Sequence, residues 1–576
     1  MSITQTSLAE LLQEHVTLEV ESIDRMYLNV YIPKLQRESG ASWFLKQQRQ
    51  YPVASSAAMA PTAAVEVAVH GLFEARLEGP DAPDPLDVEA KAEILTPSGR
   101  REHVPLFWDG GRVWRLRYSP EAPGGYEYKT TLGGAGGRFS ARPGDGATEL
   151  DREGAPRLAG SRRLFEHVSG KPWFWLADTA WNGALLSAER EWDDYLSARV
   201  RQRFTAVQFV LTQWRASYAD EQGRKAFRLD DGKVVVDPAF FARMDRRVAA
   251  IRAHGLVPVP VMLWALSSKW DESPGGHLDV PQAARLASYL NARYAAYGSL
   301  WMLGGDGDYG GEKAQRWREI GRAVFSNVTR RPVTLHPGGM KDPWPGLADE
   351  PWIDFFTYQS GHGNDARKWK WQLEEAPKSA RLEPPRPIID AEPNYEAHPS
   401  YGRKQTITDY HVRRAAYTSL LSAPVAGVTY GAHGIWPWLR ERAVPLNHPG
   451  SGEGDPVSVC LRYPGAAQMK ILRDILDRVP WWSLRPAPEM IRDNKIDEEY
   501  SNAVVAGRAE SGREALIYAP KGPSLKLNLA DWRAGARGTW IDPRTGAARE
   551  PAPLSNAAGL ELNLPGEADW VLLIQQ

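Results

Sequence analysis

Cysteine and net charge are both nearly missing from this sequence. Its 576 residues include one cysteine, Cys460, and carry a formal net charge of −1 at pH 7. A single cysteine excludes an intramolecular disulfide and a cysteine-cluster metal site. Without excess positive charge, the chain also lacks the general attraction that binders of nucleic acid and anionic membranes use. We therefore expect no nucleic acid and no membrane as partners, and a small, locally recognised ligand instead.

Long apolar runs are missing as well. No stretch approaches the roughly 20 apolar residues that cross a bilayer. The first residues, MSITQTSLAELLQEHVTLEVESIDR, have neither the basic segment nor the apolar core of a secretory signal. As written, the sequence predicts a cytoplasmic protein. A periplasmic or secreted location would fit a true start further downstream, and no pattern indicates an oligomeric state.

Eight short apolar runs alternate with amphipathic stretches of helical length in the middle of the chain. The runs are FWLAD (174–178), AVQFVLTQW (206–214), LVPVPVMLW (256–264), SLWMLGGD (299–306), PVTLHP (332–337), DFFTYQSGH (354–362), PIIDAEP (387–393) and GVTYGAHG (427–434). The helical pattern is weakest after the fifth and sixth runs. Eight strand-then-helix units predict an α/β fold, a (β/α)8 TIM barrel over residues 146–483.

The segments on either side of the predicted barrel have β patterns. Residues 61–145 hold short alternating runs separated by turn signals, which predict an antiparallel β-sandwich. Residues 484–576 predict a second small β domain of the same kind. Residues 1–60 contain no motif and end in a Pro/Ala/Ser-rich stretch, so we interpret them as an extension and linker without a role in the chemistry.

The predicted strands end in polar and aromatic side chains, and the active site of a TIM barrel lies at these ends. The candidate substrate-binding residues are Asp178, Trp181, Gln213, Trp214, Trp264, His336, Tyr358, Gln359, His362, Tyr430, His433 and Trp436. The chain has 23 tryptophans in total, and indole faces bind the C–H-rich faces of sugars, although large core residues are the plainer interpretation. Because sugar hydroxyls also need many donors and acceptors, the pattern predicts a carbohydrate pocket.

Two carboxylates at strand ends are the candidate catalytic residues. Asp306 ends the fourth run and Glu392 lies at the end of the seventh, so they should face each other across the mouth of the barrel. Glycoside hydrolysis normally uses such a pair, one carboxyl as acid and the other as nucleophile or base. The alternatives are a helix cap at Asp306, a role that Asp308 fills more naturally, and an ion pair at Glu392.

Three further carboxylates lie near the same strand ends. We expect Asp178, Asp390 and Glu396 to support the site or the fold rather than to act in the reaction.

Several motifs resemble the apiosidase-like (DUF4038) glycoside hydrolases. They are WFWLADTAWN, SLWMLGGDGD, FFTYQSGHG, PIIDAEPNYEAHP, RRAAYTSLLSAPVAGVTYGAHGIW and PGAAQMKILRDIL, which cover most of 160–482. The resemblance places the family's Gly-Gly-Asp aspartate on Asp306 and the glutamate of its Asp-x-Glu-Pro on Glu392, and it implies hydrolysis with retained configuration. Gly307-Asp308-Tyr309 replaces the Arg-Asn that often follows the aspartate, so the substrate and the pocket wall can differ from the family's.

The flanking segments carry resemblances of their own. Val65–Arg142 resembles the DUF5060 β-sandwich, and GTWIDPRTG with GEADWVLLIQ is similar to a C-terminal domain named for collagen binding, a name we do not take as an activity.

Three other functions compete with glycoside hydrolysis as interpretations of these motifs. Gly305–Gly310 matches G-x-G-x-x-G, but its two carboxylates would repel a pyrophosphate. His336, His362 and His433 come from separate strands without metal-ligand spacing, so we expect no metal and no cofactor, and we expect these histidines to bind sugar hydroxyls or the catalytic carboxylates. A non-catalytic carbohydrate-binding protein is the alternative from another class. It would keep the aromatics and lose a carboxylate, whereas both are present here.

Overall fold

A computed structural model describes most of the chain. The described residues are 54–57, 65–266, 273–328, 331–402, 405–532, 535–549 and 554–576, and all contacts below lie within one compact unit, Ala54–Gln576. Most of the extension expected over residues 1–60 lies outside this description. Its described part forms strand β1 (Ala54–Ala57), which pairs in parallel with β3 (Phe73–Glu78). The domain boundaries near residues 60, 145 and 483 stay predictions.

An eight-stranded parallel sheet curls into a barrel at the centre of the fold, which confirms the predicted fold class. Its strands are β13 (Trp175–Thr179), β14 (Ala206–Val210), β17 (Val257–Trp264), β18 (Trp301–Gly305), β19 (Val333–Thr334), β20 (Phe356–Tyr358), β21 (Ile388–Asp390) and β22 (Gly427–Gly431). Ladders join all neighbours except β19 and β20. There Asp354 N donates to Val333 O over 2.9 Å and Thr334 Oγ1 donates to Phe355 O over 2.7 Å, which closes the ring.

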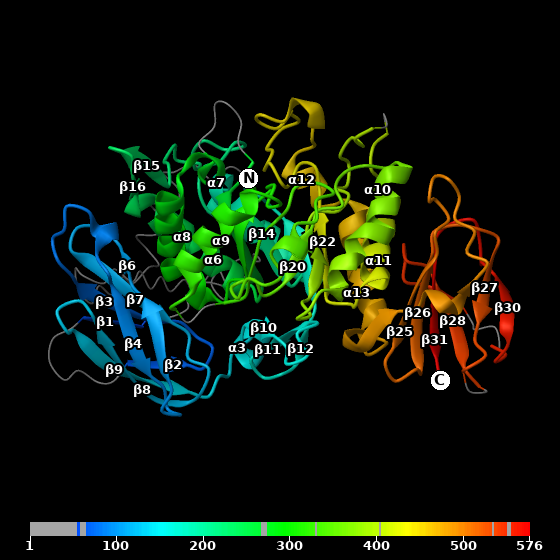
Figure 1. Cartoon of the computed structure of the whole chain (residues 1–576), viewed down its shortest axis with the longest axis horizontal. Helices are drawn as coiled ribbons and strands as arrows, with labels where there is room; N and C mark the ends of the chain where they lie inside the picture. Colours follow the sequence, from blue (N-terminus) through cyan, green and yellow to red (C-terminus); the bar gives the residue numbers. More distant parts are fainter. Residues whose placement is uncertain are drawn as a thin grey trace, which may run out of the picture. The chain divides into compact units, whose positions relative to one another are not determined.

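Helices cover the outside of the barrel, so its strands are buried on both faces and read as continuous apolar runs. In Figure 1, α6, α8 and α9 lie on one side of the barrel strands, and α11 and α13 lie on the other. Before the first barrel strand lies α3 (Glu149–Glu153). The α-helices described after it in the barrel are α4 (Gly183–Leu186), α5 (Glu189–Arg201), α6 (Pro238–Ala253), α7 (Pro274–His277), α8 (Val280–Tyr294), α9 (Lys313–Phe325), α10 (Ala366–Lys370), α11 (Asp409–Ser422), α12 (Val457–Cys460) and α13 (Pro464–Leu476). None of the helices in the described part of the chain is long and apolar enough to cross a membrane.

The helical layer is thin after β19 and β20, where the sequence pattern is weakest. A single 3-10 turn, Trp344–Gly346, follows β19. After β20, α10 continues into a π turn at Trp371–Glu375 and a 3-10 turn at Ala376–Arg381. Pro343 and Pro345 lack the backbone N–H that a regular helix needs, which explains the first of these short elements.

Two sheets form the N-terminal β-sandwich. One contains β1, β3, β7 (Val113–Tyr118) and β6 (Phe107–Trp108), and the other contains β2 (Val65–Ala68), β9 (Gly136–Arg142), β8 (Gly124–Thr130), β4 (Lys91–Leu95) and β5 (Arg101–Pro105). Phe73 and Phe139 stack between the sheets with ring centroids 3.9 Å apart. A buried ion pair attaches the sandwich to α6 of the barrel, because Arg117 binds both Glu74 (2.7 Å) and Asp245 (2.7 Å).

The C-terminal domain is also a pair of antiparallel sheets. They consist of β23 (Leu484–Pro486), β25 (Val505–Ala509), β26 (Glu514–Ala519), β31 (Trp570–Gln575), β28 (Arg537–Ile541) and β29 (Ala548–Arg549), and of β24 (Ile491–Arg492), β27 (Ser524–Asn528) and β30 (Ala558–Asn563). Arg413 of α11 reaches into this domain and binds both oxygens of the buried Asp569, at 2.9 and 3.0 Å. Tyr417 of the same helix stacks on Tyr518, with centroids 4.7 Å apart.

Candidate active site

A cavity of about 470 Å³ opens at the carboxyl ends of the barrel strands, within the size range of small-molecule sites. Both predicted catalytic carboxylates line it. Six of the predicted substrate-binding residues line it too: Trp181, Trp214, Trp264, Gln359, His362 and Trp436. Eight of the predicted residues, which end or follow seven of the eight barrel strands, therefore line one cavity.

Glu392 is held by two histidines. It lies two residues beyond the end of β21, and its Oε1 and Oε2 lie 3.0 Å from His362 Nε2 and 3.1 Å from His336 Nε2. The Nδ1 atoms of these rings face backbone carbonyls, Pro393 O at 3.0 Å for His362 and Pro337 O at 3.1 Å for His336. A backbone carbonyl therefore fixes the Nδ1 side of each ring, and Nε2 is directed at the Glu392 carboxylate.

The electrostatics of this arrangement favour an ionised Glu392. Burial alone would raise the pKa of its carboxyl, but the bonds and the positive charge of His336 and His362 outweigh burial and lower the pKa to about 2. The carboxylate correspondingly raises the pKa of His336 against the opposite effect of burial. At neutral pH, Glu392 is an anion with both oxygens bonded.

Asp306 has a different setting at the end of β18. The two glycines before it leave room for neighbouring rings, since a Cβ on Gly305 would lie 2.7 Å from the Trp264 ring and one on Gly304 would lie 2.6 Å from the Tyr309 hydroxyl. Asp306 itself has φ 46°, a left-handed conformation that costs free energy for a residue other than glycine. Gly307 N donates to His336 O over 3.2 Å and anchors the loop just beyond Asp306.

Burial keeps Asp306 protonated at mildly acidic pH. Desolvation and then the negative charge of Glu392 raise its pKa to about 6, against smaller opposing effects of His336, Arg215 and His362. One cavity thus holds two carboxyl groups whose surroundings drive their pKa values in opposite directions. Such a divergence separates an acid from an anion in enzymes that use two carboxyl groups.

Three tryptophans form the inner wall beside this pair. The rings of Trp214 and Trp264 lie 4.1 Å apart and those of Trp181 and Trp264 lie 5.4 Å apart, measured between centroids. Trp214 Nε1 donates to Asn182 Oδ1 over 2.7 Å, which fixes its plane. The wall therefore presents rigid aromatic surface next to the carboxylates.

The remaining predicted substrate-binding residues lie outside the cavity lining. Asp178 is fully buried and binds Arg199 of α5 (2.6 Å) and Tyr195. Gln213 bonds to the backbone of Ala226 and Phe227. These contacts tie strand ends to the surrounding helices and loops.

The other four of this group pack behind the cavity wall. His336 holds Glu392 from behind. Tyr358 packs against Trp371, with centroids 5.7 Å apart. His433 Nε2 faces Gly452 O at 3.3 Å, and Tyr430 bonds to Glu396.

Asp390 and Glu396 form hydrogen bonds within the fold. Asp390 accepts from the backbone N–H of Ser360 (3.2 Å), from Gln372 and from Ser419. Glu396 accepts from Tyr430 (2.7 Å) and from Gly465 N. Each of these two carboxylates accepts hydrogen bonds on both of its oxygens.

Several lining residues were not predicted from the sequence. They are Arg215, Leu266, Met340, Tyr395, His398, Tyr401 and His448, among others. His398 and Tyr395 lie within the PNYEAHP motif that follows Glu392 and could have been found there. His448 and Tyr401 lie well beyond the ends of their strands, where the strand-end rule gives no signal.

The loop after Asp306 shows where this chain departs from the resemblance. Tyr309 turns inward and packs on Trp317, with centroids 5.0 Å apart, and a Cβ on Gly307 would lie within 2.4 Å of its ring. Asp308 points to the surface and pairs with Lys313 at 3.2 Å. Of the residues from Asp306 to Tyr309, Asp306 alone lines the cavity.

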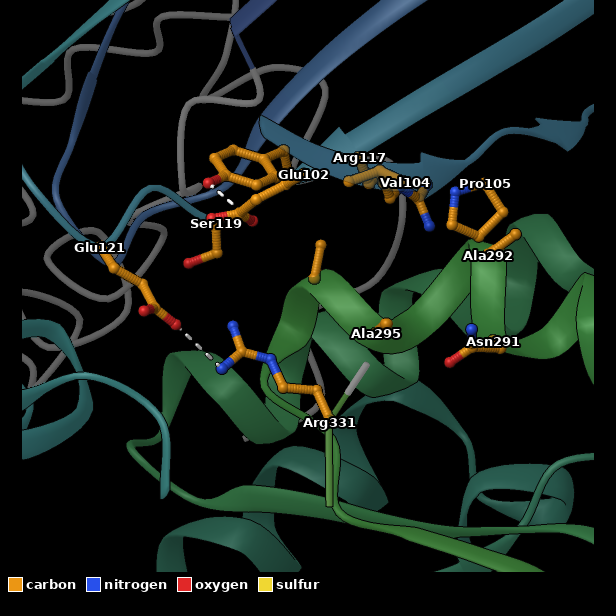
Figure 2. Close-up of a pocket in the computed structure, with 12 residues that line it drawn as sticks. Glu102, Val104, Pro105, Arg117, Ser119, Glu121, Asn291, Ala292, Ala295 and Arg331 are labelled. Carbon is orange, nitrogen blue, oxygen red and sulfur yellow. Dashed lines mark hydrogen bonds and ion pairs between the residues drawn. The ribbon is translucent and has the colours of Figure 1, made fainter. Parts of the chain in front are cut away.

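No group of three or more His, Cys, Asp or Glu suited to a metal ion occurs among the described residues. A second cavity, of about 90 Å³, lies between the N-terminal sandwich and α8. Figure 2 shows Glu121 paired to Arg331 in this cavity. Glu102 accepts a hydrogen bond from the Tyr118 hydroxyl.

A parallel barrel with two carboxyl groups and a tryptophan wall at its strand ends is the architecture of a carbohydrate-active enzyme. Residues 159–483, more than half of the chain, match the family described as "Apiosidase-like, catalytic domain". The chain belongs to this family and is a glycoside hydrolase. Residues 66–133 match DUF5060, and residues 486–575 match a domain described as "Putative collagen-binding domain of a collagenase".

Solved structures share the fold at low sequence identity. A protein described as a glycoside hydrolase is 21% identical with a TM-score of 0.64, over 74% of this chain and 97% of its own. A glycoside hydrolase family 5 protein from Bacteroides vulgatus ATCC 8482 is 21% identical with a TM-score of 0.65, over 74% and 93%. No curated protein sequence matches the chain significantly.

Proposed function

We propose that this glycoside hydrolase acts with retention of configuration, with Asp306 as the acid and base and Glu392 as the nucleophile. The observation that carries the proposal is the opposite setting of the two carboxyl groups in one cavity. Glu392 is bonded to two imidazoles and has a lowered pKa, whereas Asp306 is desolvated and has a raised pKa. A nucleophile must be ionised and a general acid protonated at the same pH, and this pairing meets both needs.

In the first step, Glu392 attacks the anomeric carbon while Asp306 donates its proton to the oxygen of the leaving group. The bonds from His336 and His362 hold the carboxylate in one plane, and each oxygen keeps a second lone pair for attack. Loss of its proton leaves Asp306 as an anion. In the second step, Asp306 takes a proton from water, and the hydroxide formed cleaves the glycosyl-enzyme ester.

The substrate-binding roles follow from position. We assign sugar contacts to Trp181, Trp214, Trp264, Gln359, His362 and Trp436, which line the cavity around the two carboxyl groups. Asp178, Gln213, Tyr358, Tyr430 and His433 would then act on the substrate only through the residues that they position.

The stereochemistry of the product tests the mechanism. Aryl glycosides and plant or bacterial polysaccharides are screened for released sugar, and the first-formed anomer from any substrate found is identified by proton NMR before mutarotation. We expect the anomer of the substrate. The opposite anomer would show inversion and would remove the nucleophile role from Glu392.

A further inference from the structure

Exposed apolar side chains gather around the mouth of the active-site cavity. Nine large hydrophobic side chains are exposed in the described part of the chain, and five of them lie on loops that follow barrel strands. These five are Tyr218, Leu266, Tyr401, Val444 and Leu446. Clusters of exposed apolar surface on a soluble protein commonly mark binding sites.

Two of the five, Leu266 and Tyr401, line the cavity itself. Leu266 follows β17 and Tyr401 lies on the loop after β21, and these strands are four apart in the ring of eight. Strands four apart in such a ring lie on opposite sides of the barrel. Leu266 and Tyr401 therefore approach the mouth from opposite sides.

Each of the two side chains is tied to one catalytic carboxyl group. Ala265 N donates to Gly305 O over 2.7 Å, so Leu266 and Asp306 are the next residues on two bonded segments. Tyr401 N donates to His362 O over 3.0 Å, and His362 holds Glu392. The Tyr401 ring also packs against that of His398, with centroids 5.2 Å apart.

The cavity is layered by exposure. Trp181, Trp214 and Trp264 on the inner wall are at most 3% exposed, whereas Leu266 is 40% and Tyr401 is 50% exposed. The acid must contact the glycosidic oxygen, which joins the transferred sugar to the leaving group. Asp306 has an exposure between those of the two groups of side chains. We therefore place the sugar that becomes attached to Glu392 in the buried part and the leaving group in the outer part.

We propose that Leu266 and Tyr401 form the binding site for the leaving group. The leaving group contains a six-membered ring with apolar faces, and the two side chains contact its opposite faces. The inference rests on the proposed function, because it takes Asp306 as the acid. Both a sugar and a phenol have this chemistry, since a pyranose presents C–H groups on its faces and a phenol presents its π surface.

The test compares leaving groups with and without a ring. Using the sugar identified by the screen, kcat/KM is measured for its p-nitrophenyl glycoside, for a disaccharide and for the glycosyl fluoride. Leu266→Ala and Tyr401→Ala should each lower kcat/KM about tenfold for the first two substrates and clearly less for the fluoride. Tyr401→Phe keeps the ring and should restore most of the loss. If the loss is larger with the disaccharide, the natural leaving group is a sugar. If it is larger with the aryl glycoside, the natural leaving group is a phenol.

Matched controls are exposed apolar residues away from the mouth, Val200→Ala for Leu266 and Trp482→Ala for Tyr401, which are 41% and 42% exposed. An equal loss on all three substrates would overturn the proposal, because the two residues would then only shape the cavity. No loss on any would overturn it as well.

A binding measurement separates this proposal from the proposed reaction. Saturation-transfer NMR with p-nitrophenol alone needs no turnover. Signal with the wild-type protein that disappears in the Leu266→Ala/Tyr401→Ala double variant supports the site even if no glycoside is cleaved. Signal that persists in the double variant, or none with the wild type, contradicts it.

Discussion

The surroundings of Glu392 and Asp306 differ more than their shared cavity suggests. Around Glu392, His362 is hydrogen-bonded to one oxygen and His336 forms an ion pair with the other. Asp306 has a left-handed backbone conformation, and its carboxyl group is desolvated beside the negative charge of Glu392. Polar partners thus stabilise one carboxyl group as an anion, and their scarcity keeps the other protonated. The comparison indicates that the hydrogen-bond partners and charges around a carboxylate determine its role more than its position at a strand end does.

The largest expected effect comes from removing Glu392, the proposed nucleophile. Glu392→Gln should lower kcat on every substrate by on the order of 10⁴-fold or more, because no glycosyl-enzyme can form. Glu396→Gln is the matched control, since that carboxylate lies four residues further on and binds Tyr430 and Gly465 instead. If azide restored turnover of Glu392→Gln with an inverted product, it would support Glu392 as the nucleophile and say nothing of Asp306.

Replacing the acid should have a smaller effect that depends on the leaving group. Asp306→Asn should cost about 10²- to 10⁴-fold on unactivated glycosides and much less in the first step of activated aryl glycosides. External azide should partly restore its turnover with retained configuration, because azide replaces the water that Asp306 activates. Equal losses on activated and unactivated substrates would contradict the role of Asp306 as the acid.

The two histidines should matter through the pKa of Glu392. His336→Ala and His362→Ala each remove one charge-assisted bond, so kcat/KM should fall roughly 10- to 100-fold. The acid limb of the pH profile should also move to higher pH, as the pKa of Glu392 returns toward its ordinary value. His433→Ala is the control, because that ring bonds to Gly452 O and Trp436 and should leave the acid limb in place.

The raised pKa of Asp306 should be measurable as a cost to stability, without any substrate. Its folded pKa of about 6 exceeds the ordinary 3.8, so ionisation is harder in the folded state. The penalty is absent below about pH 4, grows as the pH rises toward 6 and is complete above that, at up to about 3 kcal/mol. Asp306→Asn should therefore raise the melting temperature by a few degrees at pH 8, relative to its effect at pH 4.5. A shift that is the same at both pH values would contradict the assigned pKa.

The smallest effect is expected at Asp308, two residues beyond Asp306. Asp308 has an exposed side chain that pairs with Lys313, so Asp308→Asn should change the free energy of unfolding by about 0.5 kcal/mol or less and leave the pH profile unchanged. A shifted profile would mean that the loop after Asp306 also tunes the acid.

Sequence patterns predicted the barrel because its strands are uniformly apolar and end in polar residues. They could not predict which way a side chain at a strand end points, because successive residues of a strand face opposite sides. Asp178 and Tyr430 lie within their strands and contact Arg199 and Glu396, outside the cavity. The histidines that bind Glu392 come from two other strands, and only the closed ring brings them together.

Cavity residues on long loops were harder to predict than those at the strand ends. Tyr401 and His448 lie on long loops whose path depends on contacts such as the bond from Tyr401 N to His362 O. Conversely, the short elements after β19 and β20 followed from weak periodicity and prolines, so the sequence did indicate where the helical layer is thin.

The link between Arg413 and Asp569 has a consequence for modular engineering. A binding module that is exchanged between proteins usually carries its own core and leaves its host intact when it is cut away. Here, truncation at the start of the C-terminal domain would remove Asp569, one of the two carboxylates that bind the guanidinium of Arg413, on the helix leading into the last barrel strand. The Tyr417 ring of the same helix would lose its stacking partner Tyr518 as well. Transplanting or deleting this domain would therefore require a redesign of α11, which makes it a fixed part of the enzyme rather than a detachable accessory.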